Sequence, residues 1–193
     1  ADMRDRLAEL DNGSRGRVLD DEIRKILDAH HSPERLAAGP LDVIIHKNLD
    51  ALGSFEGRDR VAALDSLGFQ RQLIFNSSFL NSLTMLDRNG PQDLSLGATR
   101  AHNRGVVEFC SADRRLLPVC WVPFATIGSA IEVGRQALDG GAAALMIPSI
   151  CPREHGPTHV GFDPLWAMAE EAEIPIVFHV GGGRPMDPAY KRN

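Results

Sequence analysis

His179 is the residue of this sequence best placed to do chemistry. It follows the apolar run Ile174 to Phe178 and stands just before three consecutive glycines. A neutral imidazole at the end of a buried strand is a common metal ligand, and it can also act as a general base. The structural alternative is a core histidine bonded to the backbone. The glycines favour a site, because they let the chain turn sharply and approach a ligand closely.

Three further side chains are candidates for substrate contact. Asn76 ends an apolar run, Arg184 follows the glycines, and His155 lies in a loop rich in proline and glycine. A guanidinium such as that of Arg184 is suited to a substrate carboxylate. Each residue has an ordinary alternative, namely a turn for Asn76, a surface position for Arg184 and loop packing for His155.

The other histidines give weaker signals. His155 and His159 are four residues apart, which suits a metal only on a helix, and the prolines and glycines around them exclude a helix. The adjacent His30 and His31 are interpreted as a solvated pair, since neighbouring side chains on a helix do not face one another. His102 falls within a predicted helix, where it either supports a site from behind or simply packs.

No residue can be assigned a catalytic role from the sequence. The motif GxSxG is absent, so no Ser-His-Asp arrangement is proposed. Paired carboxylates occur only in runs such as Glu170-Glu171, which are typical of a solvated helix face.

Four apolar runs with helical patterns between them must position these residues. The predicted strands are residues 70–75, 116–122, 142–147 and 174–178. This alternation predicts a parallel sheet with helices outside it, in which functional groups gather at the C-terminal ends of the strands. Residues 79–97 are predicted to be mostly loop with some helix, and Val43 to Ile45 to be a short strand or a buried turn. Thr126 is predicted to cap a helix, and Pro33 to interrupt the helical N-terminal segment.

The predicted fold class is α/β, a (β/α)8 barrel present only in part. Such barrels need about 250 residues, more than the 193 of this chain. An open wound sheet is the competing architecture, but neither GxGxxG nor GxxxxGK[ST] is present. We expect an N-terminal helical and loop segment over residues 1–57 and the partial barrel over residues 58–193.

Composition narrows the classes of partner and location. The net charge is −5 with mixed signs along the chain, so no nucleic acid is expected as a partner. No apolar run reaches the length of a membrane span, so no membrane association is expected, and no signal peptide is visible. The three cysteines show no CxxC pairing and are interpreted as reduced thiols, which together predict a cytoplasmic protein.

Four blocks of this sequence resemble the amidohydrolase-2 family. They read DRVAALDSLGFQRQLIFNSS, AHNRGVVEFCSADRRLLPVCWVPF, ALDGGAAALMIPS and HVGFDPLWAMAEEAEIPIVFHVGGG, and the resemblance covers residues 58–184. Members similar to aminocarboxymuconate-semialdehyde decarboxylase are metal-dependent (β/α)8 hydrolases and decarboxylases. The order of the blocks carries the resemblance rather than any single one.

The resemblance implies a divalent metal, zinc in most members, held by an HxH pair on the first strand, a histidine ending the fifth and a late aspartate. His179 matches the fifth-strand ligand. This sequence has no HxH pair. The chain is therefore expected to be an internal piece that carries the second to fifth strands and is inactive by itself.

Two functions follow as expectations. The first is a metal-dependent hydrolase or decarboxylase that acts on a small carboxylate or cyclic substrate through a metal-activated water or carbonyl. The alternative is a non-catalytic scaffold or binding module that has lost the metal site. Because a partial barrel leaves strand edges unpaired, we also expect a homo-oligomer.

Overall fold

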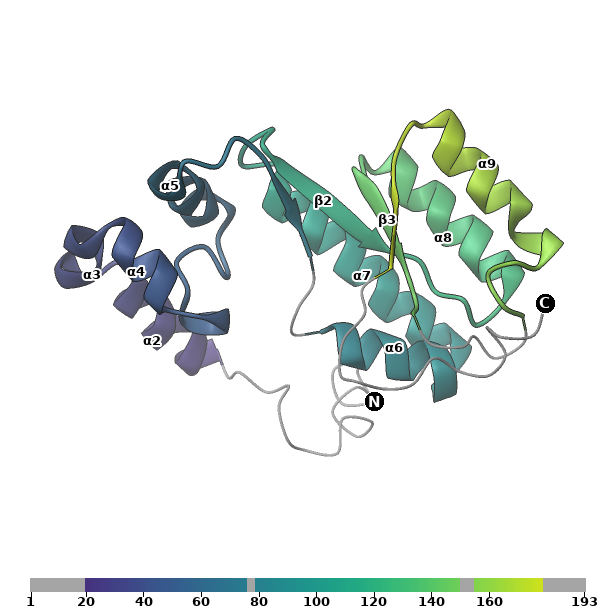
Figure 1. Cartoon of the computed structure of the whole chain (residues 1–193). Coiled ribbons are helices and arrows are strands. Elements are labelled where there is room, and N and C mark those ends of the chain that lie inside the picture. Colours follow the sequence, from purple (N-terminus) through teal and green to yellow (C-terminus); the bar gives the residue numbers. More distant parts are fainter. Residues whose placement is uncertain (1–19, 76–78, 150–154, 179–193) are drawn as a thin grey trace. The chain divides into compact units, whose positions relative to one another are not determined.

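The computed structural model describes residues 20–75, 79–149 and 155–178 (Figure 1). Within these ranges the helices are α2 (Asp20–His30), α3 (Pro33–Ala38), α4 (Pro40–Ile45), α5 (Gly57–Leu67), α6 (Leu80–Asn89), α7 (Gln92–Cys110), α8 (Ile127–Asp139) and α9 (Asp163–Glu171). Two short 3-10 helices are η1 (Asn48–Asp50) and η2 (Val160–Phe162). The strands are β1 (Gln72–Ile74), β2 (Leu116–Trp121), β3 (Ala144–Ile147) and β4 (Ile176–Phe178).

The described strands form one sheet in the order β1-β2-β3-β4. The pairs β2–β3 and β3–β4 are parallel, with Trp121 opposite Met146 and Met146 opposite Val177. At the β1 side, the Gln72 amide donates to the Arg115 carbonyl oxygen over 2.9 Å. A parallel sheet whose strands follow in chain order, with helices between them, is consistent with part of an α/β barrel. The predicted fold class is thereby confirmed in part.

The described residues fall into two compact units. One unit, called here the N-terminal unit, holds the residues before 79 together with 108–117. The other, called here the α/β unit, holds residues 79–107 and those from 118 onward. Both α7 and β2 contribute residues to each unit. The division at residue 57 stays a prediction.

The core of the α/β unit is built on β2 and β3. All four residues of β3 are at most 1% exposed, as expected for a strand covered on both faces in a parallel sheet. Against this sheet pack α8 and α9, which lie side by side (Figure 1). Gly134 of α8 permits that closeness, because a side-chain carbon there would collide with Leu165 of α9.

Local sequence signals explain where several elements begin and end. The Thr126 hydroxyl accepts the Ser129 amide over 3.1 Å and so caps α8, as predicted. Gly68 ends α5 in the left-handed conformation, with φ of 71°, which a residue without Cβ adopts at little cost. The interruption predicted at Pro33 is also found, since Pro33 opens α3.

Two expectations about local structure are wrong. Residues 79–97 are not mostly loop, because α6 and the first turns of α7 occupy most of them. Val43, Ile44 and Ile45 are neither a strand nor a buried turn: they end α4, and Ile44 and Ile45 are exposed. Pro40 supplies the helix start that the sequence reading missed, since proline fits the first helical turn.

In the ranges that the structure describes, no helix is long and apolar enough to cross a membrane. Cys110 and Cys120 are buried thiols, as the sequence led us to expect. Burial raises the pKa of the Cys110 thiol to about 11, which keeps it protonated.

Candidate functional site

The candidate site is the edge at which the parallel strands of the α/β unit end. Strand β2 ends at Trp121, β3 at Ile147 and β4 at Phe178. The segments that leave this edge are the loop from β2 to α8 and the loop from β3 to α9. Functional groups of parallel α/β folds come from such loops.

Of the predicted site residues, only His155 lies within the described part of the chain. His179, predicted as a metal ligand, and Asn76 and Arg184, predicted to contact substrate, lie outside the described residues. His155 lies in the loop between β3 and α9, the kind of segment in which the sequence reading placed it.

A buried carboxylate fixes the loop after β2. Asp87 of α6 is only 4% exposed, and its two oxygens accept the backbone N–H groups of Phe124 and Ala125 over 2.8 and 2.9 Å. Hydrogen bonds to an ionised acceptor are about twice as strong as neutral ones. The loop is therefore held rigidly at the candidate edge.

A side-chain amide holds the end of β2 itself. Asn103 of α7 donates to the Trp121 carbonyl and accepts the Trp121 N–H, each over 2.8 Å. This is the pair of bonds that a neighbouring strand would make. Asn103 thus takes the place of a strand at the point where β2 ends.

An aromatic cluster joins the loop after β2 to the loop after β3. The rings of Phe124 and Phe162 stack with centroids 4.4 Å apart and planes 9° from parallel. The ring of Trp166 of α9 lies near both, with its centroid 6.0 Å from that of Phe124 and 6.2 Å from that of Phe162. Phe124 and Phe162 are each only 1% exposed. The two loops consequently form one packed platform.

Two imidazoles lie in the loop between β3 and α9. The rings of His155 and His159 stack with centroids 4.1 Å apart and planes 25° from parallel. The Gly161 N–H donates to Nδ1 of His159 over 3.0 Å. An acceptor nitrogen carries no proton, so the neutral ring bears its proton on Nε2.

His102 of α7 is a partly buried residue of the α/β unit. Burial lowers its pKa to about 4, so the ring is neutral near pH 7. Its Nε2 has no hydrogen-bond partner in the described structure, and the ring lies 6.5 Å from that of Phe79. Of the two alternatives that the sequence left open for His102, the contacts favour packing.

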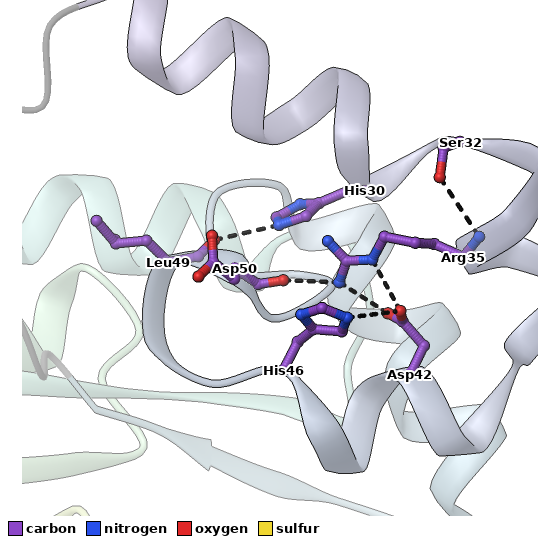
Figure 2. A network of polar contacts seen from close by, with 7 residues as sticks. All are labelled: His30, Ser32, Arg35, Asp42, His46, Leu49 and Asp50. Atoms are coloured by element: carbon purple, nitrogen blue, oxygen red, sulfur yellow. Dashed lines mark hydrogen bonds and ion pairs between the residues drawn. The ribbon is translucent and has the colours of Figure 1, made fainter.

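A second concentration of polar side chains lies in the N-terminal unit (Figure 2). Arg35 donates from Nε and one terminal nitrogen to both oxygens of Asp42, each over 2.8 Å, and also to the Asp50 carbonyl over 2.7 Å. The His46 ring approaches the same carboxylate at 3.3 Å. The hydrogen bond from Arg35 holds the pKa of Asp42 below its ordinary value. Asp42 is thus committed to an ion pair and is not a free base.

The adjacent histidines of this unit have separate environments. His30 is 1% exposed and bonds through Nε2 to the Leu49 carbonyl over 3.1 Å, so its prediction as a solvated residue is wrong. Burial lowers the pKa of His30. His31 is exposed and lies 2.8 Å from Asp59, whose hydrogen bond raises the pKa of His31.

The sequence reading missed both Asp87 and Arg35. Their partners lie 37 and 38 residues away for Asp87, and 7 residues away for Arg35, so no local pattern marks them. The one available signal was Asp87 within a helix whose other inward residues are apolar, Leu83 and Leu86. A charged residue on an apolar face indicates a buried polar contact.

The residues described do not by themselves make a metal site. No group of three or more histidine, cysteine, aspartate or glutamate side chains among them could hold an ion. Tight zinc sites use three or four protein ligands. A metal centre would have to draw on residues outside the described ranges, of which His179 is the predicted one.

The comparisons with known proteins found a likeness in structure but none in sequence. No family model matches the chain, and no curated protein does either. Among solved structures, the chain is similar to the crystal structure of an amidohydrolase from Mycobacterium avium subsp. paratuberculosis K-10, with a TM-score of 0.57 and 18% identity. The match covers 68% of this chain and 35% of the amidohydrolase, so the chain spans about a third of that protein. At this identity the likeness shows the fold alone, which this chain shares with about a third of that protein.

Proposed function

We propose that this chain is part of a metal-dependent amidohydrolase-type enzyme that hydrolyses or decarboxylates a small carboxylate or cyclic substrate. The observation that carries the proposal is the likeness in fold to a solved amidohydrolase over 68% of the chain. The sequence blocks that resemble the amidohydrolase-2 family support it independently of the fold.

In this proposal the strand ends carry the chemistry. His179 serves as one ligand of a divalent metal, zinc in the first instance, which when bound would polarise a water or a carbonyl. The remaining ligands come from elsewhere in the protein, because this sequence has no HxH pair. His155, Asn76 and Arg184 contact the substrate.

The platform formed by the two loops supplies the rigidity that such a site needs. Asp87 and the Phe124–Phe162 stack hold the loop backbone in one arrangement before a substrate arrives. Because positioning errors of about 1 Å can cost a hundredfold in rate, a pre-organised edge favours catalysis. The same rigidity would serve a binding protein equally well.

A non-catalytic scaffold is the second candidate. The observation that favours it is the lack of any group of three possible metal ligands among the described residues. In that case the parallel sheet and its platform would bind a partner or small molecule without turning it over.

Metal-dependent turnover separates the two candidates. The protein encoded by the complete reading frame is purified and assayed on panels of small amides, lactones and aromatic carboxylates, before and after treatment with a chelator. We expect turnover that the chelator abolishes and zinc restores. Turnover that the chelator leaves unchanged, or none with zinc added, would favour the scaffold.

The homo-oligomer and the cytoplasmic location stay predictions. Light scattering on the same purified sample measures the first directly, with a mass of one chain as the contradicting result.

A further inference from the structure

We propose that the stacked pair His155–His159 is a binding site for the carboxylate group of a small organic acid. The proposal deepens the proposed function and rests on it in one respect, namely that substrate approaches the ends of the strands. It names the chemical class that this edge recognises and the two side chains that recognise it.

The first observation concerns which ring nitrogen of His159 carries the proton. The Gly161 N–H occupies Nδ1 over 3.0 Å, which places the ring proton on Nε2. A nitrogen that carries a proton cannot donate its lone pair to a metal. His159 is therefore a hydrogen-bond donor toward an acceptor oxygen, and a metal role for the pair is disfavoured by the structure as it was by the sequence.

The second observation is that this arrangement is built into the backbone. A side-chain carbon on Gly161 would collide with Ile127 and would come within 3.0 Å of the His159 ring. Glycine at position 161 lets the backbone pass close to the imidazole and to the Ile127 side chain of α8. A larger residue there would require the Ile127 side chain and the His159 ring to shift.

The third observation is that, within the described residues, no acceptor is recorded for the ring N–H groups of His155 and His159. His159 is exposed and His155 is partly exposed. In the described structure their recorded contacts are the ring stack and the Gly161 bond, and neither imidazole is paired with a carboxylate. Stacking holds the two rings together, so little side-chain freedom remains to be lost when a ligand binds.

The ligand class follows from these three observations. His159 presents an ordered N–H at Nε2, and the neutral His155 ring stacked on it carries one N–H of its own. Two neighbouring donors can serve the two oxygens of a carboxylate, and bonds to a charged acceptor are the stronger ones. Val160, which follows His159 in the sequence, is an apolar side chain that is 71% exposed. A carboxylate on an apolar body is thus the favoured ligand.

The test uses benzoate as the probe and benzamide as its uncharged counterpart. Histidine ring signals of the isotope-labelled complete protein are followed by NMR as each compound is added. We expect benzoate to shift the signals of His155 and His159 and to leave those of His31 unchanged, and benzamide to shift none of them. The ring of His159 should show its proton on Nε2.

Two variants keep the fold while removing the donors. His159→Asn retains an oxygen that can accept the Gly161 N–H, since asparagine is a good cap, but has no donor at the position of Nε2, because its amide NH2 lies nearer the backbone. His155→Phe retains an aromatic ring for the stack and removes both nitrogens. We expect His159→Asn to weaken benzoate binding about tenfold or more, with an unchanged melting temperature for both variants.

The outcomes separate this site from the proposed function, because the titration needs neither metal nor turnover. Equal benzoate binding by His159→Asn and wild type, equal shifts with benzamide, or a proton on Nδ1 would each overturn the carboxylate site. Benzoate binding without metal-dependent turnover would overturn the proposed function alone. Turnover whose KM and kcat both survive His159→Asn would overturn the site alone.

Discussion

Within this protein, each of the two units is stabilised by a different balance of contacts. The α/β unit has a continuous apolar core, in which Leu145 and Leu165 are fully buried and a stack of aromatic rings links two loops. In the N-terminal unit Leu64 and Leu116 are buried as well, but α3 and α4 bury no apolar side chain and make charged contacts such as Arg35–Asp42.

The N-terminal unit also leaves much of its apolar surface uncovered. Four large aliphatic side chains on or beside α3 and α4 are 57–61% exposed, namely Leu36, Leu41, Ile44 and Ile45. Burial of apolar surface is the dominant stabilising force in folding, and surface ion pairs contribute little. We therefore expect the α/β unit, where the candidate site lies, to be the more rigid of the two.

The same substitution in each unit provides the strongest contrast. Leu165→Ala in α9 removes a side chain that is fully buried, and Leu36→Ala in α3 removes one that is 57% exposed. We expect Leu165→Ala to lower the free energy of unfolding by about 2–5 kcal/mol, and Leu36→Ala to change it by less than about 0.5 kcal/mol. Urea denaturation of both variants measures this, and equal losses would erase the contrast.

The buried imidazole of the α/β unit predicts a dependence on pH. The folded pKa of His102 is about 4, against 6.5 for a free histidine. Between these values the unfolded chain takes up a proton that the folded chain refuses, so stability falls as pH falls through this window. The loss attributable to His102 is about 3 kcal/mol at 1.36 kcal/mol for each pKa unit.

His102→Leu tests this dependence, and the contribution of His31 to stability is expected to change with pH in the opposite direction. The leucine variant should flatten the acid-side loss measured by denaturation at a series of pH values. His31 has a raised pKa, so its contribution is present below 6.5 and fades as pH rises through its folded pKa. His31→Asn should therefore lower stability slightly at acid pH only. An acid-side loss that persists in His102→Leu would rule out His102 as its source.

Asp87 is the buried charge on which the platform depends. Asp87→Asn leaves only one acceptor for the two N–H groups of Phe124 and Ala125, and we expect it to cost about 1–3 kcal/mol. Hydrogen exchange at these two amides should accelerate, whereas the control Asp139→Asn on the exposed end of α8 should change neither stability nor exchange. Unchanged exchange at both amides would show that the loop is held by its aromatic contacts alone.

The smallest expected effect on stability is that of replacing Arg35 by lysine, which tests the N-terminal unit. Arg35→Lys keeps the charge but cannot reproduce the fork to Asp42 and the bond to Asp50, so we expect a loss of about 1 kcal/mol. Arg100→Lys, at the exposed pair with Glu132, should cost close to nothing. Equal effects of the two substitutions would mean that Arg35–Asp42 behaves as an ordinary surface pair.

The sequence predicted the α/β unit far better than the N-terminal unit, and the difference in contacts explains why. A buried strand such as Ala144–Ile147 and a helix with one apolar face leave a periodic pattern in the chain. The strands β2 to β4 and the cap at Thr126 were therefore found. Polar contacts leave no such pattern, since Arg35–Asp42 and His31–Asp59 become visible only once the helices are placed.

The errors share the same cause. Ile44 and Ile45 were expected to be a strand or a buried turn, because two adjacent β-branched residues favour extended structure. Pro40 and the contacts of Asp42 instead stabilise a helix that leaves both exposed. His30 was expected in solvent because adjacent side chains on a helix do not face one another and so do not form a metal pair. It is instead buried and bonds to the Leu49 carbonyl.

The candidate site was predicted only in part. The sequence identified the edge of the sheet and the loop of His155, since strand ends can be located from apolar runs. It could not show that His155 stacks on His159, because Pro157 and Gly156 between them remove any regular spacing. Nor could it show Asp87 and Asn103 holding the end of β2, since both contacts join residues far apart in the chain.

The measurement that tests the central claim most directly is the divalent metal content of the complete protein. Wild type, His179→Ala and His159→Asn are purified in parallel and analysed for bound metal and melting temperature. We expect stoichiometric metal in wild type and in His159→Asn, and loss of metal without loss of the fold in His179→Ala. Wild type without metal, or His179→Ala that keeps its metal but melts at a much lower temperature, would contradict the account.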